Sequence, residues 1–248
     1  MKQKIMIFLL ITCWSSNSQA SLRLISSSNN AKVAQSNVTA INCGTGIALL
    51  TTTHGLTSLF ENGNMASAII SNDNIQIKIN KSDIIQHFYS DISVISPVKG
   101  ISLADYNALI DMSYPLARAA MNCSLGRCNR VDVSPNQKVI IKSFIDNNVM
   151  SQDSEITLLG ILSFSGVIAK ALEHDWYFLI AIQALTSMSG SPVLDSNAET
   201  IVGMVKGRIL NENNDSINLV YAYRASAFSD VCSVNYAYRL HVNDDSSE

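Results

Sequence analysis

Three short segments of the chain carry side chains that could perform nucleophilic catalysis. His54 follows an apolar, β-branched run, Asp91 precedes the run Ile-Ser-Val-Ile, and Ser189 begins the sequence Ser-Gly-Ser-Pro. A serine hydroxyl is a poor nucleophile until a neighbouring base removes its proton, and imidazole does this near neutral pH. A carboxylate beside the imidazole fixes its tautomer and stabilises the protonated form. Together these three groups would suit an acyl-transfer reaction.

Each segment alone also has an ordinary interpretation. A histidine after an apolar strand is most often a packed or surface residue, and an aspartate before such a run simply begins a strand. The glycine and proline that follow Ser189 are typical of a tight turn. The combination is more specific, because α/β-hydrolases and subtilisins do not have the chain order His, Asp, Ser. The residues lie 37 and 98 positions apart, which suits two groups on one folding unit and the third on the next.

The combined pattern resembles the chymotrypsin/trypsin-like serine protease superfamily, nearer to its bacterial glutamyl-endopeptidase and HtrA-like members than to digestive trypsins. Four motifs carry the resemblance, at residues 44–54, 91–95, 189–192 and 201–204. They are similar to the family's Gly-x-Gly and Thr-Ala-x-His segment, to Asp-Ile-Ala-Val-Leu, to Ser-Gly-Gly/Ser-Pro and to Val-Val-Gly-Ile. The likeness implies a serine endopeptidase with His54, Asp91 and Ser189 as its triad, acting on peptides or proteins.

The resemblance also implies where an oxyanion would be stabilised. The backbone N–H groups of Ser187 and Ser189 would form the oxyanion hole. The family usually has glycine at the position of Ser187, and glycine adopts backbone angles that a Cβ disfavours. A protease-like binding protein without turnover is therefore an alternative to the endopeptidase. A secreted serine esterase is another, because acyl transfer to water is shared chemistry.

Five residues approach the primary substrate pocket by the same resemblance: Gln183, Thr186, Lys206, Gly207 and Arg208. Gln183 falls where trypsin-like enzymes have an acidic residue, so cleavage after Arg or Lys is disfavoured. Lys206, Arg208 or the nearby His174 could attract an acidic substrate side chain. The alternative is that these are solvated surface charges.

The rest of the sequence predicts an all-β fold. Short β-branched segments alternate with clusters of Asn, Asp, Ser and Gly, such as residues 146–148, which predict turns. By resemblance we expect two six-stranded antiparallel β-barrels with the active site in the cleft between them. Residues 21–115 would form the first barrel, and residues 116–248 the second barrel with a C-terminal helix and tail. Ser226 would cap that helix over residues 227–233.

The first twenty residues read as a secretory signal peptide. Two lysines precede an apolar run at residues 5–14, and small residues at 18 and 20 predict cleavage after Ala20. A buried N-terminal helix and lipid attachment at Cys13 are alternatives. We therefore expect a secreted or periplasmic protein. Its mature chain should have no membrane span, because no later apolar stretch is long enough.

The cysteine count predicts two disulfides. The mature chain keeps four cysteines, an even number that in exported proteins usually forms bridges. We favour Cys123–Cys128, which share one short loop, and this choice leaves Cys43–Cys232. Zinc is the alternative, but the pattern lacks a second close pair and a histidine at finger-like spacing.

No cofactor motif or basic field stands out in the sequence. His87, His174 and His241 are isolated, without a His-x-x-x-His pair, so we expect no metal. The chain has no phosphate-binding loop or dinucleotide fingerprint, so we expect no cofactor. The formal net charge of −3 gives no field to attract nucleic acid. The oligomeric state stays open.

Overall fold

The computed structural model describes most of the chain after the predicted leader. The described residues are 22–25, 35–44, 46–61, 67–71, 75–86, 91–96, 100–117, 120–124, 127–131, 133–151, 154–171, 177–182, 188–209 and 219–232. Among them, no helix is long and apolar enough to cross a membrane.

The first half of the chain forms a curled sheet that is nearly a closed barrel. Its strands are β1 (Leu22–Ile25), β2 (Gln35–Asn42), β3 (Ile47–Thr52), β4 (Ser67–Ser71), β5 (Gln76–Asn80), β6 (Ile84–Gln86), β7 (Ile92–Ile95) and β8 (Tyr114–Pro115). Seven follow the order β5-β4-β1-β2-β3-β7-β6, and β8 pairs with β2 in parallel. The path nearly closes because only the 3-10 turn η1 (Lys81–Asp83) separates β5 from β6. In β5, Ile77 and Ile79 are buried while Gln76 and Lys78 are exposed, as their alternation predicts.

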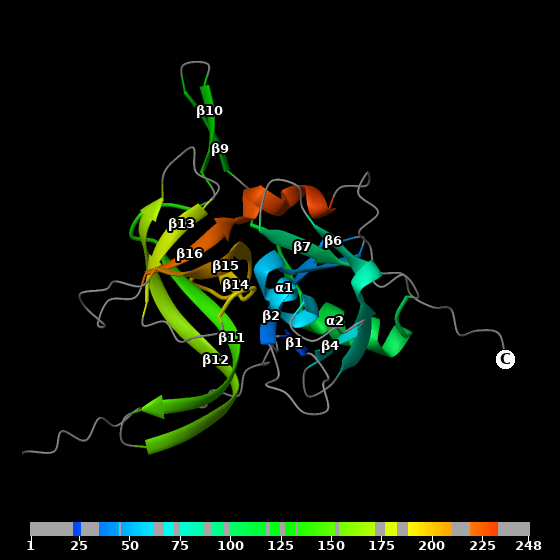
Figure 1. Ribbon diagram of the computed structural model, residues 1–248. Coiled ribbons are helices and arrows are strands. Elements are labelled where there is room, and N and C mark those ends of the chain that lie inside the picture. Colours follow the sequence, from blue (N-terminus) through cyan, green and yellow to red (C-terminus); the bar gives the residue numbers. More distant parts are fainter. Residues whose placement is uncertain are drawn as a thin grey trace, which may run out of the picture.

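The second half forms a closed barrel in the order β11-β12-β13-β16-β15-β14. Its strands are β11 (Lys138–Ser151), β12 (Ser154–Ala171), β13 (Tyr177–Ala181), β14 (Pro192–Leu194), β15 (Ile201–Ile209) and β16 (Leu219–Arg224). A hairpin of β9 (Ala120–Ser124) and β10 (Arg127–Val131) precedes it, and Figure 1 shows the barrel beside the first sheet. The two-barrel prediction is confirmed. The first sheet has eight described strands where six were predicted: seven lie on the main path, and β8 pairs with β2 beside that path.

Two local predictions were wrong. Residues 146–148 do not form a turn but lie within β11, paired with β12, and the two strands continue beyond the barrel in Figure 1. Pairing with a partner strand overrides the local turn preference of Asp and Asn. The C-terminal helix is the 3-10 segment η2 (Ala225–Cys232), which includes Ser226 instead of starting after it. Its helical angles break at Phe228, whose fully buried ring packs between the barrels.

Among the described residues, three apolar clusters form the core, and one of them joins the barrels. The first cluster lies within the first sheet and another within the closed barrel. The third combines Leu50 and Ile92 of the first sheet with Met204 and Tyr223 of the second barrel and Phe228 of η2. Helices α1 (Thr53–Glu61) and α2 (Leu103–Met112) accompany the first sheet. The barrels are therefore held against each other by a shared core.

A disulfide links the end of β2 to the end of the described chain. Cys43 is bonded to Cys232, across a sequence separation of 189 residues. Cys123 and Cys128 are directly opposite each other in the β9–β10 pairing, and the second predicted bridge stays a prediction.

We predict that replacing both Cys43 and Cys232 by alanine lowers the free energy of unfolding by about 2–5 kcal/mol, because the unfolded chain loses a long cross-link. Urea unfolding of the oxidised protein and the double variant measures the difference. Equal unfolding midpoints would contradict the prediction.

Candidate active site

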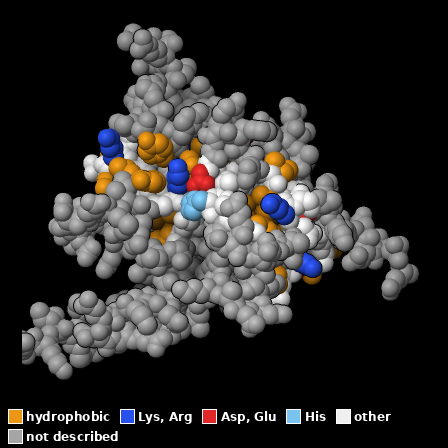
Figure 2. Space-filling view, in the orientation of Figure 1, with side chains coloured by type: hydrophobic (Ala, Val, Ile, Leu, Met, Phe, Trp, Pro, Cys, Tyr) orange, Lys and Arg blue, Asp and Glu red, His pale blue; other side chains and the backbone are white. Residues whose placement is uncertain are grey.

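The structure brings together the three residues predicted to form the triad. Nδ1 of His54 lies 2.5 Å from Oδ2 of Asp91, and Nε2 of His54 lies 3.2 Å from Oγ of Ser189. The imidazole is about half exposed and the carboxylate is 22% exposed. Figure 2 shows a histidine and an acidic side chain side by side on this face, with a basic side chain next to them. The geometry is that of a proton relay open to solvent.

Two paired strands of the first sheet position the histidine and the aspartate. Thr52 at the end of β3 is the antiparallel partner of Ile92 at the start of β7. His54 and Asp91 therefore lie at the same end of neighbouring strands. The Thr53 N–H donates to the Asp91 carbonyl at 3.1 Å, which extends the ladder by one step.

The Asp91 carboxylate is held by both of its oxygens. Oδ1 accepts the backbone N–H of His54 at 2.8 Å, while Oδ2 faces the imidazole of the same residue. His54 lies in the first turn of α1, where backbone N–H groups lack partners within the helix. The Asp91 carboxylate therefore does two things: Oδ1 accepts the helix N–H of His54, and Oδ2 orients the imidazole of the same residue.

Hydrogen bonding keeps the Asp91 carboxylate ionised. Burial raises the pKa of the Asp91 carboxyl. The side-chain and backbone hydrogen bonds from His54 and the charges of His54 and Lys206 together outweigh burial, so the pKa of Asp91 lies below its ordinary value. A carboxylate that stays charged at neutral pH can stabilise a protonated imidazole.

A tight turn at the start of β14 presents Ser189. Its next residue, Gly190, has φ of +84°, and a Cβ there would lie 2.0 Å from the carbonyl oxygen of Asn37. The Gly190 N–H donates to the Val205 carbonyl, and the Ser191 N–H donates to the Met188 carbonyl. Only glycine suits this position, since both the backbone angle and the close approach exclude a side chain.

The first barrel binds this turn through residues that sequence reasoning missed. The Asn37 N–H donates to the Ser189 carbonyl at 3.0 Å, and Thr39 Oγ1 donates to the Gly190 carbonyl at 2.7 Å. Thr51 Oγ1 in turn donates to the Asn37 carbonyl at 2.7 Å. All three residues that donate are fully buried. No local signal identifies them, because β2 mixes polar and apolar residues and Thr39 lies 151 positions from its partner Gly190.

The two glycines of the 44–54 motif are not among the residues described above as contacting the turn that carries Ser189. Gly44 and Gly46 form the turn between β2 and β3, where the Cys43 N–H donates to the Gly46 carbonyl. Asn37 and Thr39, which contact the nucleophile turn, lie further back along β2.

The predicted pocket and oxyanion residues are only partly described. Gln183, Thr186 and Ser187 lie outside the described residues, as does His174. Lys206, Gly207 and Arg208 lie on β15, and the Lys206 carbonyl accepts a hydrogen bond from Ser189 Oγ at 3.0 Å. A Cβ on Gly207 would meet nothing within 4 Å, so the surface above it is open.

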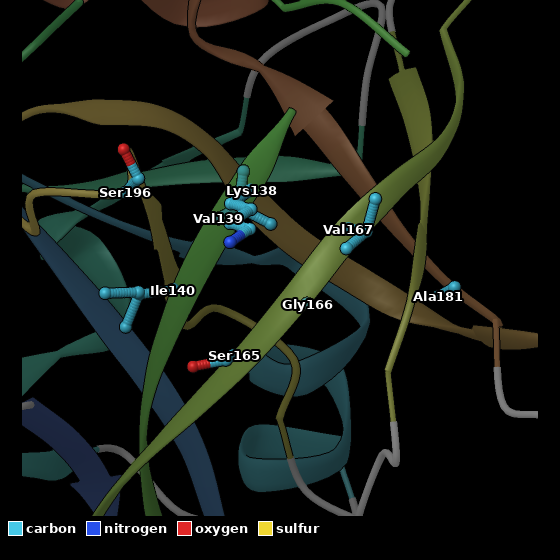
Figure 3. Close-up of a pocket in the computed structure, with 8 residues that line it drawn as sticks. All are labelled: Lys138, Val139, Ile140, Ser165, Gly166, Val167, Ala181 and Ser196. Atoms are coloured by element: carbon cyan, nitrogen blue, oxygen red, sulfur yellow. The ribbon is translucent and has the colours of Figure 1, made fainter. Parts of the chain in front are cut away.

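A separate pocket of about 350 Å³ lies on the closed barrel, away from these residues. Figure 3 shows Lys138 of β11, Val167 of β12 and Ala181 of β13 along it. These side chains are exposed, and no triad residue lines the pocket.

Comparison with known proteins identifies solved structures that share this fold. No family model matches the sequence, and the search of curated proteins finds no match. Among solved structures, the active form of the Rv3671c protease from M. tuberculosis aligns with a TM-score of 0.55 and 11% identity, over 92% of this chain and 84% of that one. The tobacco etch virus protease complexed with product aligns with a TM-score of 0.51 and 10% identity, over 88% of this chain and 80% of that one.

The fold is chymotrypsin-like. At these identities the likeness concerns the fold alone. The nearer similarity to glutamyl endopeptidases and HtrA-like proteins stays a prediction. The structural matches and the sequence motifs agree on this fold.

We predict that Thr39→Val lowers the free energy of unfolding by about 1–3 kcal/mol, because the buried Gly190 carbonyl loses its donor. Thr39→Ser, which keeps the hydroxyl, should lose less. Urea unfolding measures both variants. A valine variant as stable as the unsubstituted protein would show that this hydrogen bond does not stabilise the turn.

Proposed function

We propose that the protein is an exported serine endopeptidase that hydrolyses peptide bonds through His54, Asp91 and Ser189. The observation that carries the proposal is the continuous contact from carboxylate to imidazole to hydroxyl, within a fold that known proteases share. The fold alone does not choose a chemistry, but a fold with these three groups in hydrogen-bond contact favours acyl transfer.

Acylation begins when Ser189 Oγ bonds to the substrate carbonyl carbon while its proton passes to Nε2 of His54. The carbonyl electron pair moves onto oxygen, and the N–H groups of Ser187 and Ser189 would stabilise it. The intermediate then collapses, the C–N bond breaks, and His54 gives the proton to the leaving amine. In deacylation, a water oxygen bonds to the acyl carbon while Nε2 of His54 takes its proton. The C–Oγ ester bond then breaks, and His54 gives that proton to Oγ, which restores the Ser189 hydroxyl and releases the carboxylic acid product.

The substrate is proposed to be an unfolded protein or a peptide. We place the primary pocket around Gln183, Thr186, Lys206, Gly207 and Arg208, which include no acidic residue. Cleavage after Arg or Lys is therefore disfavoured.

Export is proposed together with this activity. Residues 1–20 would be removed after Ala20, and the remaining chain would comprise two barrels divided near residue 115. The Cys43–Cys232 disulfide supports an oxidising compartment, because such bonds rarely persist in the cytosol.

A protease-like binding protein without turnover is the second candidate. Ser187 favours it, because this residue replaces the family's glycine at a position proposed for the oxyanion hole. Loss of one oxyanion donor typically costs about 10²–10³ in rate.

We predict that phenylmethylsulfonyl fluoride labels Ser189 covalently and that Ser189→Ala abolishes labelling, because only an activated hydroxyl attacks the reagent. Intact-mass spectrometry and peptide mapping measure this. Ser191→Ala is the matched control. Its hydroxyl is buried, has no hydrogen-bond partner in the described structure and should not be needed for labelling.

An unlabelled protein that also cleaves no peptide library would favour the binding protein over the enzyme. Hydrolysis of p-nitrophenyl esters without cleavage of any peptide would favour the esterase.

We predict that Asp91→Asn lowers kcat by about 10⁴-fold while the fold survives, because the amide stabilises the wrong tautomer of His54. Peptide hydrolysis under saturating substrate measures kcat, and circular dichroism monitors the fold. A folded Asp91→Asn protein with nearly full activity would exclude Asp91 from the triad.

A further inference from the structure

We propose that Lys206 and Tyr223, both from the second barrel, are positioning residues for Asp91 on the first barrel. Tyr223 holds the backbone of Asp91, and Lys206 places a fixed positive charge beside its carboxylate. This inference rests on the proposed triad and names two further residues on which the triad depends.

The Tyr223 hydroxyl makes a hydrogen bond across the barrel interface. Its oxygen accepts the backbone N–H of Asp91 at 3.1 Å, and the side chain is only 5% exposed. The ring packs in the shared apolar core together with Ile92, the residue after Asp91. Asp91 is thus fixed at its N–H by the second barrel and at its carbonyl and Oδ1 by the residues around His54.

Lys206 contacts two residues of the site, Tyr223 and Ser189. Its Nζ lies 5.5 Å from the centre of the Tyr223 ring, within the range of a cation–π interaction. Its carbonyl accepts a hydrogen bond from Ser189 Oγ at 3.0 Å. One residue of β15 therefore touches the nucleophile through its backbone and the tyrosine that holds Asp91 through its side chain.

The Lys206 ammonium group, which packs against the Tyr223 ring, lies close enough to Asp91 for its charge to act on the carboxylate. The charge of Lys206 contributes to the lowered pKa of Asp91, and Figure 2 shows a basic side chain beside the acidic one at the site. Within the described part of the chain, the titratable groups facing Asp91 are His54 of α1, Lys206 of β15 and the Tyr223 hydroxyl of β16. Lys206 is the permanent cation among them.

A permanent cation here opposes uptake of a proton by the resting site. It favours the ionised form of Asp91 over the protonated form. The competent state of the site, with a charged carboxylate, therefore persists to lower pH. Loss of the charge should shift the acid limb of the pH–rate profile to higher pH.

This role differs from the one considered for Lys206 in the sequence. A pocket lysine that attracts an acidic substrate side chain would affect the KM of acidic substrates only. A lysine that acts on Asp91 should change the pH dependence for every substrate alike. It should also change the pH dependence of labelling by reagents that have no acidic group. The two roles can therefore be separated by the choice of substrate.

The first experiment measures kcat/KM from pH 4.5 to 9 for two peptides that differ only in Glu or Leu at the cleaved residue. Labelling of Ser189 by phenylmethylsulfonyl fluoride is followed over the same range. Lys206→Met should raise the acid midpoint by about 0.5–1 pH unit for both peptides and for labelling. Lys206→Arg should keep the midpoint of the unsubstituted protein. Lys78→Met, an exposed lysine on β5, is the matched control.

The second experiment compares Tyr223→Phe with Tyr221→Phe at the pH optimum. Tyr223→Phe removes only the oxygen that accepts the Asp91 N–H and leaves the ring beneath Lys206. It should lower kcat about 3- to 10-fold, with KM and the acid midpoint unchanged, because one hydrogen bond to the positioned backbone is lost. Tyr221→Phe, on the same strand, should have no such effect.

An acid midpoint unchanged in Lys206→Met, or an effect restricted to the Glu peptide, would overturn the role of Lys206. Full kcat in Tyr223→Phe would overturn the role of Tyr223. In both cases the unsubstituted protein is active, so the proposed function stands. If the unsubstituted protein is neither labelled nor active, the proposed function is wrong and this inference fails with it.

Discussion

Docking of one barrel against the other decides whether a proton can pass between His54 and Ser189. The imidazole belongs to the first barrel and the hydroxyl to the second, and the 3.2 Å between them exists only across that interface. A displacement of about 1 Å can cost a catalytic site about 10²-fold in rate. The fold must therefore fix the barrels in both distance and direction.

Two kinds of interaction divide this task. The shared apolar core, with Leu50, Met204 and Phe228, supplies adhesion that is strong but has no preferred direction. The buried hydrogen bonds from Asn37 and Thr39 to the nucleophile turn supply direction, because a small slide leaves a buried carbonyl without its donor. Because these bonds end on Ser189 and Gly190 themselves, the turn cannot move independently of the first barrel.

The sequence predicted those residues of the site that can be recognised from their immediate neighbours in the chain. His54, Asp91 and Ser189 could be found because each lies next to a recognisable strand or turn, and Gly190 because its backbone angle excludes other residues. Ile77 and Ile79 could be placed inside by alternation alone.

Other parts could not be predicted because their partners lie far away in the chain. Thr39 hydrogen-bonds to a residue 151 positions later, and nothing near it in sequence indicates this. Tyr223 has the sequence context of an ordinary strand residue, and its hydrogen bond with the Asp91 N–H joins residues 132 positions apart. Residues 146–148 mislead for the same reason, since the pairing with β12 that makes them a strand is not local.

The hydroxyl proton of Ser189 links these constraints to reactivity. Two acceptors lie within reach of Oγ, the Lys206 carbonyl at 3.0 Å and Nε2 of His54 at 3.2 Å, but the hydroxyl has one proton. Bonded to the carbonyl, the proton is retained; bonded to Nε2, it can leave as Oγ attacks. Asp91 makes the second choice available, because a proton held on Nδ1 leaves Nε2 as an acceptor. Reactivity therefore depends on how firmly the carboxylate is held, and that in turn depends on both barrels.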